Sequence, residues 1–323
     1  MDVDVLVIGG GIAGLQAAID LGNLGLSAAV VERQPSIGGK MIGLSKVFPT
    51  LDCCSCICTP RMAEAEHHPR ITTLTYAEVQ HIRRDGSGFQ AEILQKPRYV
   101  DQDKCTGCRL CECACDVEVP HEFEGGFGAR KAIYVPFGNA VPQVALLDMD
   151  NCLLCGRCEK ACPVGAIDYL QEPEAIPVRT QAIIVATGYE MLPADFKQHY
   201  GAGPLRNVLT ALQVERLLAP HGPYGRVLRP ADGKIPESIA YVQCAGSRDL
   251  SKGVSYCSRV CCMYAIKQAM LLAGALPLAD VTLYYMDNWA FRTNWWLRWN
   301  RGCATIAANA RRLALGRPIP AKS

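Results

Sequence analysis

Several features that would assign this chain to a common class of protein are missing from its sequence. It has no uninterrupted apolar run of about 18 residues, so no transmembrane helix is predicted. No export signal is predicted, because the charged opening MDVD runs directly into the apolar stretch VLVIGGG. It has no excess of basic residues, with 33 Lys and Arg against 31 Asp and Glu. These absences predict a cytoplasmic protein with no basic face for nucleic acid.

Cysteine, in contrast, is abundant, with 18 residues in a chain of 323. Cytosolic thiols are kept reduced, so this number does not indicate a disulfide framework. Metal binding or redox chemistry is the better interpretation.

A dinucleotide-binding motif opens the chain. Val3–Ile8 is predicted to be a strand, Gly9-Gly10-Gly11-Ile12-Ala13-Gly14 a turn, LQAAIDLGNLG a helix, and SAAVVE a second strand that ends at Glu32. This is G-x-G-x-x-G between a strand and a helix, with an acidic residue about 20 positions further on. Gly9 permits the tight turn, Gly11 lets the backbone approach a pyrophosphate, and Gly14 lets the helix pack closely. A glycine-rich turn without a ligand is the alternative.

The segments that follow favour FAD over NAD. After Glu32 come Arg33 and the stretch Gly38-Gly39-Lys40, which resembles the flavoprotein extension of the motif. Further on, the stretch TQAIIVATGYEMLP is predicted to contain an apolar strand that ends in Ala186-Thr187-Gly188. It resembles the ATG strand of flavoproteins with two dinucleotide domains, such as the thioredoxin reductase group. NAD at this first site is the minor alternative.

Between these flavin segments lie two cysteine runs of the ferredoxin type. Each has the spacing C-x2-C-x2-C-x3-C, which indicates two [4Fe–4S] clusters, with the fourth cysteine of each run ligating the other cluster. One cluster is assigned to Cys105, Cys108, Cys111 and Cys162, and the other to Cys152, Cys155, Cys158 and Cys115. Zinc is the competing use of clustered thiolates, but structural zinc sites use two cysteine pairs.

The ferredoxin-type region has three further features. Asp116 follows Cys115, where proline is usual, and Cys113 is an extra thiol without an evident ligand role. Between the runs lies an unusually apolar stretch, KAIYVPFGNAVPQVALL. We expect this stretch to pack the insert against its host domain or against a partner.

A third cysteine group lies where a reductase would carry its NAD(P)H domain. SIAYVQC is predicted to be a strand and SRVCCMYAIKQAMLLAG a helix, but the turn between them contains no G-x-G-x-x-G. Cys244 ends the strand, and Cys257, Cys261 and Cys262 lie near the start of the helix. A helix N-terminus favours thiolates, so these four suit a further [4Fe–4S] cluster. Small buried hydrophobic residues are the alternative interpretation.

These segments together resemble the A subunit of CoB–CoM heterodisulfide reductase and its shorter relatives in bacterial sulfur oxidation. The resemblance runs from residue 1 to about Phe291 and lies in TLDCCSCICTPRMAEAEHHP, CTGCRLCECAC, RKAIYVPF, YVQCAGSRD and YCSRVCCMYAIKQAMLL. It implies FAD, several [4Fe–4S] clusters and electron relay among the subunits of a cytoplasmic complex. It also implies that Cys244, Cys257, Cys261 and Cys262 are cluster ligands, and it suggests that Lys267 points at the flavin ring.

A fourth cysteine group follows the FAD diphosphate loop. Alternation would place Cys54, Cys56 and Cys58 on one face of an extended segment, with Cys53 beside them. They could ligate a cluster, supply a redox thiol or fill space, and we expect them to lie near the flavin.

The carboxyl end departs from the family. From residue 288 onward there is no acidic residue and there are seven basic ones, and all four tryptophans fall within eleven residues. Residues 1–287 therefore carry a charge of about −5, from 26 basic and 31 acidic residues. No strand that would close over the flavin is evident. A basic aromatic tail that docks a partner or a membrane surface is one interpretation. A truncated or frame-shifted terminus is the favoured one, and it would weaken flavin binding.

The predicted fold class is α/β, with a Rossmann-like FAD domain of the thioredoxin-reductase type, an inserted two-cluster ferredoxin domain and a second α/β domain. The predicted segments are 1–97 (FAD domain, first part), 98–172 (ferredoxin insert), 173–200 (ATG strand), 201–287 (second α/β domain) and 288–323 (atypical tail).

The predicted function is that of an oxidoreductase subunit that relays electrons between FAD and [4Fe–4S] clusters. Its predicted partners are the other subunits of a heterodisulfide reductase-like complex and electron donor or acceptor proteins, and a homodimer is compatible with this. No catalytic acid, base or nucleophile is convincing. The alternatives are a self-contained NAD(P)H-dependent flavin reductase and a non-catalytic iron–sulfur carrier or scaffold with an incomplete flavin site.

Overall fold

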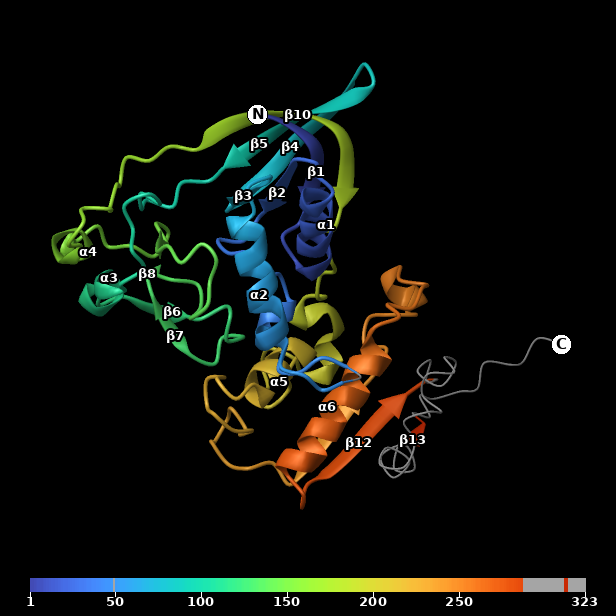
Figure 1. Cartoon of the computed structure of the whole chain (residues 1–323). Coiled ribbons are helices and arrows are strands. Elements are labelled where there is room, and N and C mark those ends of the chain that lie inside the picture. Colours follow the sequence, from blue (N-terminus) through green and yellow to red (C-terminus); the bar gives the residue numbers. More distant parts are fainter. Residues whose placement is uncertain (49, 287–310, 313–323) are drawn as a thin grey trace. The chain divides into compact units, whose positions relative to one another are not determined.

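The computed structural model describes residues 1–48, 50–286 and 311–312, so the predicted tail lies almost entirely outside the described residues. The chain folds as two compact units (Figure 1). The first comprises Met1–Leu44 and Asp52–Glu190, and the second comprises Ser45–Leu51 and the chain from Met191 onward. Among the described residues, no helix has both the length and the apolar character needed to cross a membrane.

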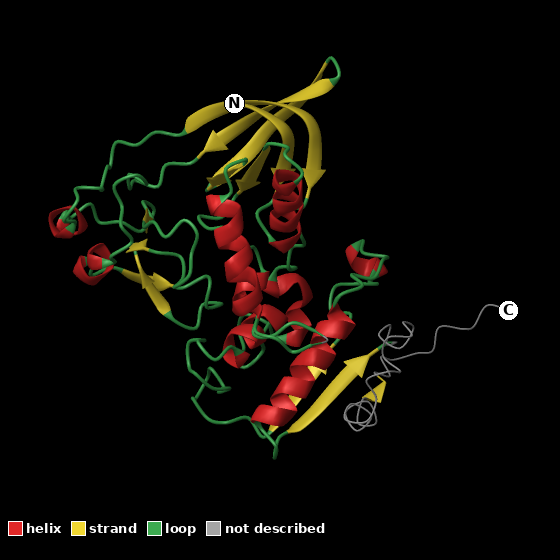
Figure 2. Ribbon diagram, in the orientation of Figure 1, coloured by secondary structure: helices red, strands yellow, loops and turns green. Residues whose placement is uncertain are grey.

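The first unit is built on a six-stranded sheet of order β3-β2-β1-β10-β5-β4. The first four strands in this order are parallel to one another, and β5 is antiparallel to both β10 and β4. The strands are β1 (Asp2–Ile8), β2 (Ala28–Glu32), β3 (Ile71–Thr75), β4 (Ala77–Asp85), β5 (Gly88–Gln95) and β10 (Glu174–Val185). The helices α1 (Ile12–Asn23) and α2 (Cys54–His67) pack beside the sheet (Figure 2).

The central strands are apolar on both faces because the sheet is covered on both sides. Val5 and Val7 of β1 pack with the helices in one core cluster, while Leu6 between them belongs to a second cluster formed with β5 and β10. Ala28 and Val30 of β2 follow the first pattern. Near-continuous apolar runs of this kind are typical of parallel strands buried on both faces. The predicted strand–turn–helix–strand opening is confirmed.

The cysteine-rich insert lies between β5 and β10 in the chain. It contains two short helices and four short strands: α3 (Leu110–Ala114), α4 (Arg157–Ala161), β6 (Glu118–Pro120), β7 (Ala129–Lys131), β8 (Ile133–Tyr134) and β9 (Leu146–Leu147). Its apolar stretch forms the insert's own core, in which Ile133, Val144 and Leu147 pack with Cys111 and Cys158.

The same stretch anchors the insert to the sheet unit. Phe137 and Val141 pack against the core of α1, α2 and β1. The amide of Ile37 donates to the carbonyl oxygen of Val141 at 3.0 Å, and the amide of Val141 donates to Ser36 Oγ at 2.9 Å. The expectation that this stretch packs the insert against its host domain is therefore confirmed.

The second unit combines helices with a small parallel sheet. Its strands are β11 (Ser238–Val242), β12 (Asp280–Tyr285) and β13 (Arg311–Arg312), and its helices are α5 (Ala211–Leu218) and α6 (Cys261–Ala275). Short 3₁₀ helices of this unit cover Ala194–Tyr200 and Leu250–Lys252. The first unit also has a 3₁₀ helix, Met41–Gly43. Ala265, Ile266 and Ala269 of α6 pack on Leu283 of β12 and on Tyr241 of β11. The predicted strand and helix on either side of the cysteine turn are confirmed.

One expectation about an element is wrong. The segment that carries Cys54, Cys56 and Cys58 is helical, because α2 begins at Cys54. The alternating pattern of these cysteines therefore does not place them on one face. The strand predicted to end at Ala186-Thr187-Gly188 is β10, which ends at Val185, directly before these residues. It begins earlier than predicted, at Glu174, because β5 pairs with its first half.

Candidate functional site

The first glycine turn joins β1 to α1 and lies against the residue that follows β10. Gly9 has φ +111°, and a Cβ there would lie 2.4 Å from the carbonyl oxygen of Ala186. A Cβ on Gly14 would lie 1.9 Å from the carbonyl oxygen of Gly9. Both positions therefore require glycine, and the roles predicted for a tight turn and for close helix packing match this geometry.

The second glycine pair closes over the first. The amide of Gly38 donates to the carbonyl oxygen of Gly10 at 2.8 Å, and Gly11 and Gly38 form an isolated parallel bridge. Gly39 has φ +56°, and a Cβ on it would lie 2.8 Å from the Cα of Gly11. The two loops thus form one side-chain-free surface at the amino terminus of α1, where backbone amides favour a bound diphosphate. Ala13 is exposed on the first turn of α1.

Glu32 lies at the end of β2 with only 7% of its surface exposed. Its Oε2 accepts a hydrogen bond from the amide of Gly10 at 2.8 Å, and its Oε1 accepts from the amide of Gln34 at 2.9 Å. A carboxylate has about four acceptor positions, so capacity for a ribose hydroxyl remains.

The other predicted flavin residues lie around the end of β10. Arg33 forms an exposed ion pair with Glu190 at 2.9 Å, and the ammonium of Lys40 lies 4.9 Å from the ring centre of Tyr189. Beyond β10, the amide of Ala186 donates to the carbonyl oxygen of Ile8 at 2.8 Å, and Gly188 is left-handed at φ +72°. Thr187 lies between them. This geometry fits a dinucleotide at the crossing of the glycine loops, and the contact of each residue with it stays a prediction.

One cavity of about 350 Å³, its opening to solvent included, lies in the insert. Its cysteine lining consists of Cys105, Cys108, Cys111 and Cys162. These are the four residues that the sequence assigns to the first cluster, three from one run and one from the other. The remaining lining is mostly apolar and includes Val100, Ala145 and Ile167.

The two runs repeat one backbone geometry. The second residue after the first cysteine is left-handed in both runs, Gly107 at φ +67° and Leu154 at φ +52°. The fourth is also left-handed, Arg109 at φ +62° and Gly156 at φ +71°, and it is the N-cap of the short helix α3 or α4. The cysteines repeat the same order of exposure, with the third of each run, Cys111 or Cys158, buried.

Hydrogen bonds to sulfur support the second run as a ligand loop. The amide of Leu154 donates to Cys152 Sγ at 3.3 Å, and the amide of Ala166 donates to Cys162 Sγ at 3.3 Å. Tyr169 Oη lies 3.4 Å from Cys158 Sγ. Hydrogen bonds to ligand sulfurs are among the features that set cluster potentials. Cys113, the extra thiol, is exposed on α3.

The thiols resist ionisation where they are buried. Burial raises the pKa of Cys111 to about 12, and it also raises the pKa of Cys158. A ligand thiol must lose its proton, so the metal must favour the thiolate strongly enough to offset this desolvation. Among the described residues, no three His, Cys, Asp or Glu side chains are grouped closely enough to hold a metal ion. A [4Fe–4S] cluster would be held by four thiolates, one from each cysteine of its set.

The third cysteine group shares local geometry with the ferredoxin loops. Arg259 is left-handed at φ +63°, and its amide donates to Cys257 Sγ at 3.3 Å, as Leu154 does to Cys152. A hydrogen bond with Cys262 lowers the pKa of Cys261 to about 6, while burial raises the pKa of Cys244. Both thiols are also influenced by their cysteine neighbours, which indicates that the four lie near one another. The geometry fits a thiolate-ligated cluster, and ligation itself stays a prediction.

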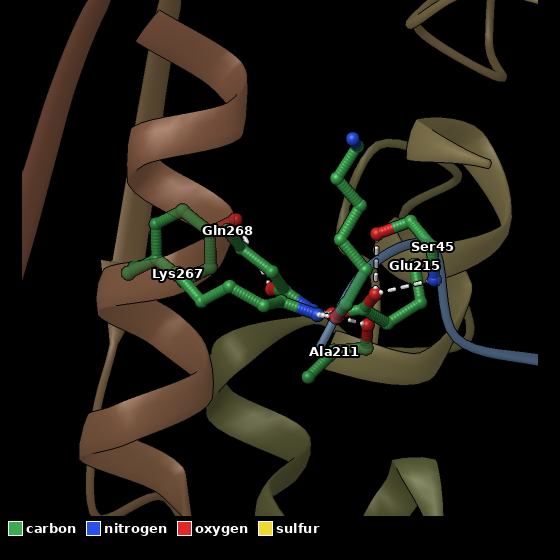
Figure 3. A network of polar contacts seen from close by, with 7 residues as sticks. Ser45, Ala211, Glu215, Lys267 and Gln268 are labelled. Carbon is green, nitrogen blue, oxygen red and sulfur yellow. Dashed lines mark hydrogen bonds and ion pairs between the residues drawn. The ribbon is translucent and has the colours of Figure 1, made fainter. Parts of the chain in front are cut away.

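Lys267 lies in a buried polar network that the sequence did not predict (Figure 3). Its ammonium donates to Glu215 Oε1 at 2.5 Å and to the carbonyl oxygen of Lys46 at 2.9 Å. Gln268 Nε2 donates to the same carboxylate oxygen at 2.6 Å, and Ser45 donates to Oε2 through both its amide and its hydroxyl. Lys267 and Glu215 are 3% and 2% exposed. The suggestion that Lys267 faces the flavin stays a prediction.

Little in the local sequence indicates this network. The capping box at Thr210 and Gln213 marks the start of α5, but nothing nearby indicates that Glu215, one helical turn further, is buried. Its partners come from α6 and from residues 45–51, which are distant in the chain.

The comparisons with known proteins agree with the dinucleotide loops and the cysteine-rich insert. The family model described as FAD dependent oxidoreductase matches residues 4–92, and the model described as 4Fe-4S binding domain matches residues 145–168. The iron-sulfur A subunit of the CoB–CoM heterodisulfide reductase of Methanocaldococcus jannaschii is 49% identical over 292 residues. An iron-sulfur A subunit of the same enzyme from Methanopyrus kandleri is 51% identical over 293 residues.

This chain is a homologue of heterodisulfide reductase A subunits. The alignments cover 90% and 89% of the chain but 44% of each relative, so the chain spans less than half the length of the curated relatives it matches. The predicted α/β FAD-binding fold is confirmed, and the insertion of two clusters stays a prediction. Likewise, the two family models support FAD and iron–sulfur cofactors, without fixing the number of clusters.

Among solved structures, the bacillithiol disulfide reductase of Bacillus cereus is similar at 13% identity and a TM-score of 0.42. The similarity covers 97% of this chain and 68% of that protein. A TM-score below 0.5 does not establish a common fold for the whole chain.

Proposed function

We propose that this chain is an electron-transfer subunit of a heterodisulfide reductase-like complex, with one FAD, two ferredoxin-type [4Fe–4S] clusters in an inserted domain and a third cluster in the second unit. The observation that carries the proposal is the attachment of the insert to the dinucleotide loop. Val141 of the insert is hydrogen-bonded to Ile37, which directly precedes the glycine pair Gly38-Gly39. A cluster domain attached at this point places its thiol-lined cavity in the same compact unit as the flavin loops.

The residues of the chain bind and orient the cofactors. The crossed glycine loops receive a diphosphate, and Glu32 orients a ribose through its remaining acceptor positions. Cys105, Cys108, Cys111 and Cys162 hold one cluster, and Cys152, Cys155, Cys158 and Cys115 hold the other. Bound FAD supplies two-electron chemistry, and each bound cluster carries single electrons. The apolar walls around the cysteines exclude water and so help to set the potentials.

The resemblance to heterodisulfide reductase A subunits also supports partner subunits and a third cluster. The partners are the other subunits of the complex, as the relatives' names indicate for those proteins. Cys244, Cys257, Cys261 and Cys262 hold the third cluster. The second candidate, a non-catalytic iron–sulfur carrier, follows if the chain binds no flavin.

Anaerobic quantification of flavin, iron and sulfide in the full chain tests the proposal. We expect one FAD and about twelve iron atoms per chain, four for each cluster. Cys162→Ser should lower the iron content by about four atoms, while Cys113→Ser, which changes an exposed thiol without a predicted ligand role, should leave it unchanged. Absence of flavin with about eight iron atoms would favour the carrier. Equal iron content in both variants would contradict the ligand assignment.

A further inference from the structure

The first turn of α2 carries a cysteine pair that the proposed cofactors do not use. Cys53 is the N-cap of this 14-residue helix, and Cys56 is its third helical residue, so the pair has the spacing C-x-x-C. Cys53 Sγ accepts a hydrogen bond from the amide of Cys56 at 3.3 Å. An N-cap side chain turns back over the third helical residue, and disulfides tolerate Cα separations of roughly 4.4–6.8 Å. The pair is therefore placed where a disulfide can form with little movement.

The four cysteines of this segment are divided between two environments. Cys54 and Cys58 are 0% exposed. Cys58 donates to the carbonyl oxygen of Gly38 at 3.7 Å, and burial raises its pKa to about 11, so it is an inert core residue. Cys56 is exposed, and Cys53 is half-buried. Within this group, only the two thiols of the C-x-x-C pair are open to a small reagent.

The helix lacks one backbone hydrogen bond just beyond the pair. Pro60 lies inside α2 and has no backbone N–H to donate to the carbonyl oxygen of Cys56, four residues earlier. The first turn is therefore tied to the rest of the helix by fewer hydrogen bonds than an ordinary turn. Beyond Pro60, Met62 and Ala65 hold the later turns of the helix in the core.

We propose that Cys53 and Cys56 form a redox-active dithiol that reduces low-molecular-weight disulfides by thiol–disulfide exchange. Cys53 attacks first, because the amide of Cys56 and the amino terminus of α2 stabilise a thiolate at the N-cap. Its sulfur bonds to one sulfur of the small disulfide, and the other sulfur leaves as a thiol, taking the proton that Cys53 gave up.

Cys56 completes the exchange. Its sulfur bonds to Cys53 Sγ, the bond between Cys53 and the small molecule breaks, and a second small thiol leaves with the proton from Cys56. Two electrons pass from the dithiol to the small disulfide, and the chain retains a Cys53–Cys56 disulfide. The exchange requires only the two thiols, so it does not depend on flavin binding.

Oxidised glutathione serves as the probe, added to the anaerobically reconstituted full chain so that cluster ligands are protected by iron. Tandem mass spectrometry then maps the tryptic peptide of residues 47–61. We expect that peptide to lose two hydrogens through a Cys53–Cys56 bond, with two glutathione thiols released per chain. Cys56→Ser should trap glutathione on Cys53, and Cys53→Ser should give neither product in the same time. Cys113→Ser, the matched exposed control, should behave as the unmodified chain.

Two results would overturn the proposal. In the first, the peptide of the unmodified chain stays reduced while added dithiothreitol is oxidised by the same glutathione. In the second, Cys53→Ser or Cys56→Ser lowers the iron content by about four atoms, which would make these residues cluster ligands. Flavin and iron are measured in the same samples, so loss of the proposed cofactors is distinguished from failure of the dithiol. Circular dichroism of each variant separates misfolding from lost reactivity.

Discussion

At the scale of single residues, the shape of the glycine loops and of the cysteine runs is set by backbone conformation. Gly9 and Gly39 are left-handed, and Gly14 lies against another backbone segment. In the cysteine runs, left-handed positions recur two and four residues after the first cysteine, even where the residue is Leu154 or Arg109. A non-glycine residue held in this region costs about 1–2 kcal/mol, so the repeated shape indicates a functional loop.

Gly14→Ala tests the crossed glycine loops. The added Cβ would lie 1.9 Å from the carbonyl oxygen of Gly9, so α1 must move away from β1. We expect a loss of about 1–3 kcal/mol in the free energy of unfolding and a markedly lower flavin content. Urea unfolding and flavin absorbance measure the two effects.

Gly128→Ala is the control for this substitution. Gly128 lies in the same unit, is not left-handed, and has no atom within 4 Å of an added Cβ. Its substitution should change stability by no more than about 0.5 kcal/mol and leave the flavin content unchanged. Full flavin content in Gly14→Ala would refute the proposed diphosphate site.

Contacts between distant segments decide structure and burial at the scale of elements. β10 is long because β5 pairs with its first half and β1 with its second. In the second unit, Glu215 of α5 joins Lys267 and Gln268 of α6 to Ser45. One carboxylate therefore holds two helices and a distant segment together.

Glu215→Gln tests how much this network stabilises the second unit. The uncharged amide leaves the Lys267 ammonium buried without its counter-charge, and its NH₂ group cannot accept the hydrogen bonds that Oε2 receives from Ser45. We expect a loss of about 3–5 kcal/mol in the free energy of unfolding. Urea unfolding and faster hydrogen exchange in peptides of α5 and α6 measure it.

Glu64→Gln is the control for the buried pair. Glu64 forms an exposed ion pair with Arg61 three residues away on α2, and such pairs contribute little. Its removal should change stability by less than about 1 kcal/mol. If Glu215→Gln were equally mild, the buried network would not be a significant source of stability.

At the scale of the whole molecule, the described chain combines crossed glycine loops in the first unit with a cysteine-bearing turn in the second. The turn after β11 carries Cys244 instead of a glycine motif, and α6 begins at Cys261. The chain covers 44% of the length of the Methanocaldococcus jannaschii subunit.

NADH and NADPH should therefore fail to reduce the flavin of the reconstituted chain directly. Between β11 and α6 the chain has no G-x-G-x-x-G motif to receive a pyrophosphate. We expect no rapid loss of flavin absorbance with either nucleotide under anaerobic conditions, and full loss with dithionite. Rapid bleaching by NADH alone would contradict the relay and favour a self-contained reductase.

The sequence by itself determined the parts of this protein that are encoded over short spans. The glycine turn between β1 and α1, the paired cysteine runs and the strand and helix around Cys244 depend on spacing and local pattern, so each is readable from neighbouring residues. The resemblance to heterodisulfide reductase A subunits was also carried by such short motifs.

Only the tertiary structure decided features that depend on distant partners. Alternation in residues 53–58 favoured an extended segment, but packing of Cys58 and Met62 against Gly38 makes it helical and divides its thiols into buried and open pairs. Burial of Glu215 depends on residues 45–51 and α6. The physical reason is that spacing within a segment fixes which groups share a loop, whereas desolvation and long-range hydrogen bonds exist only after remote segments meet.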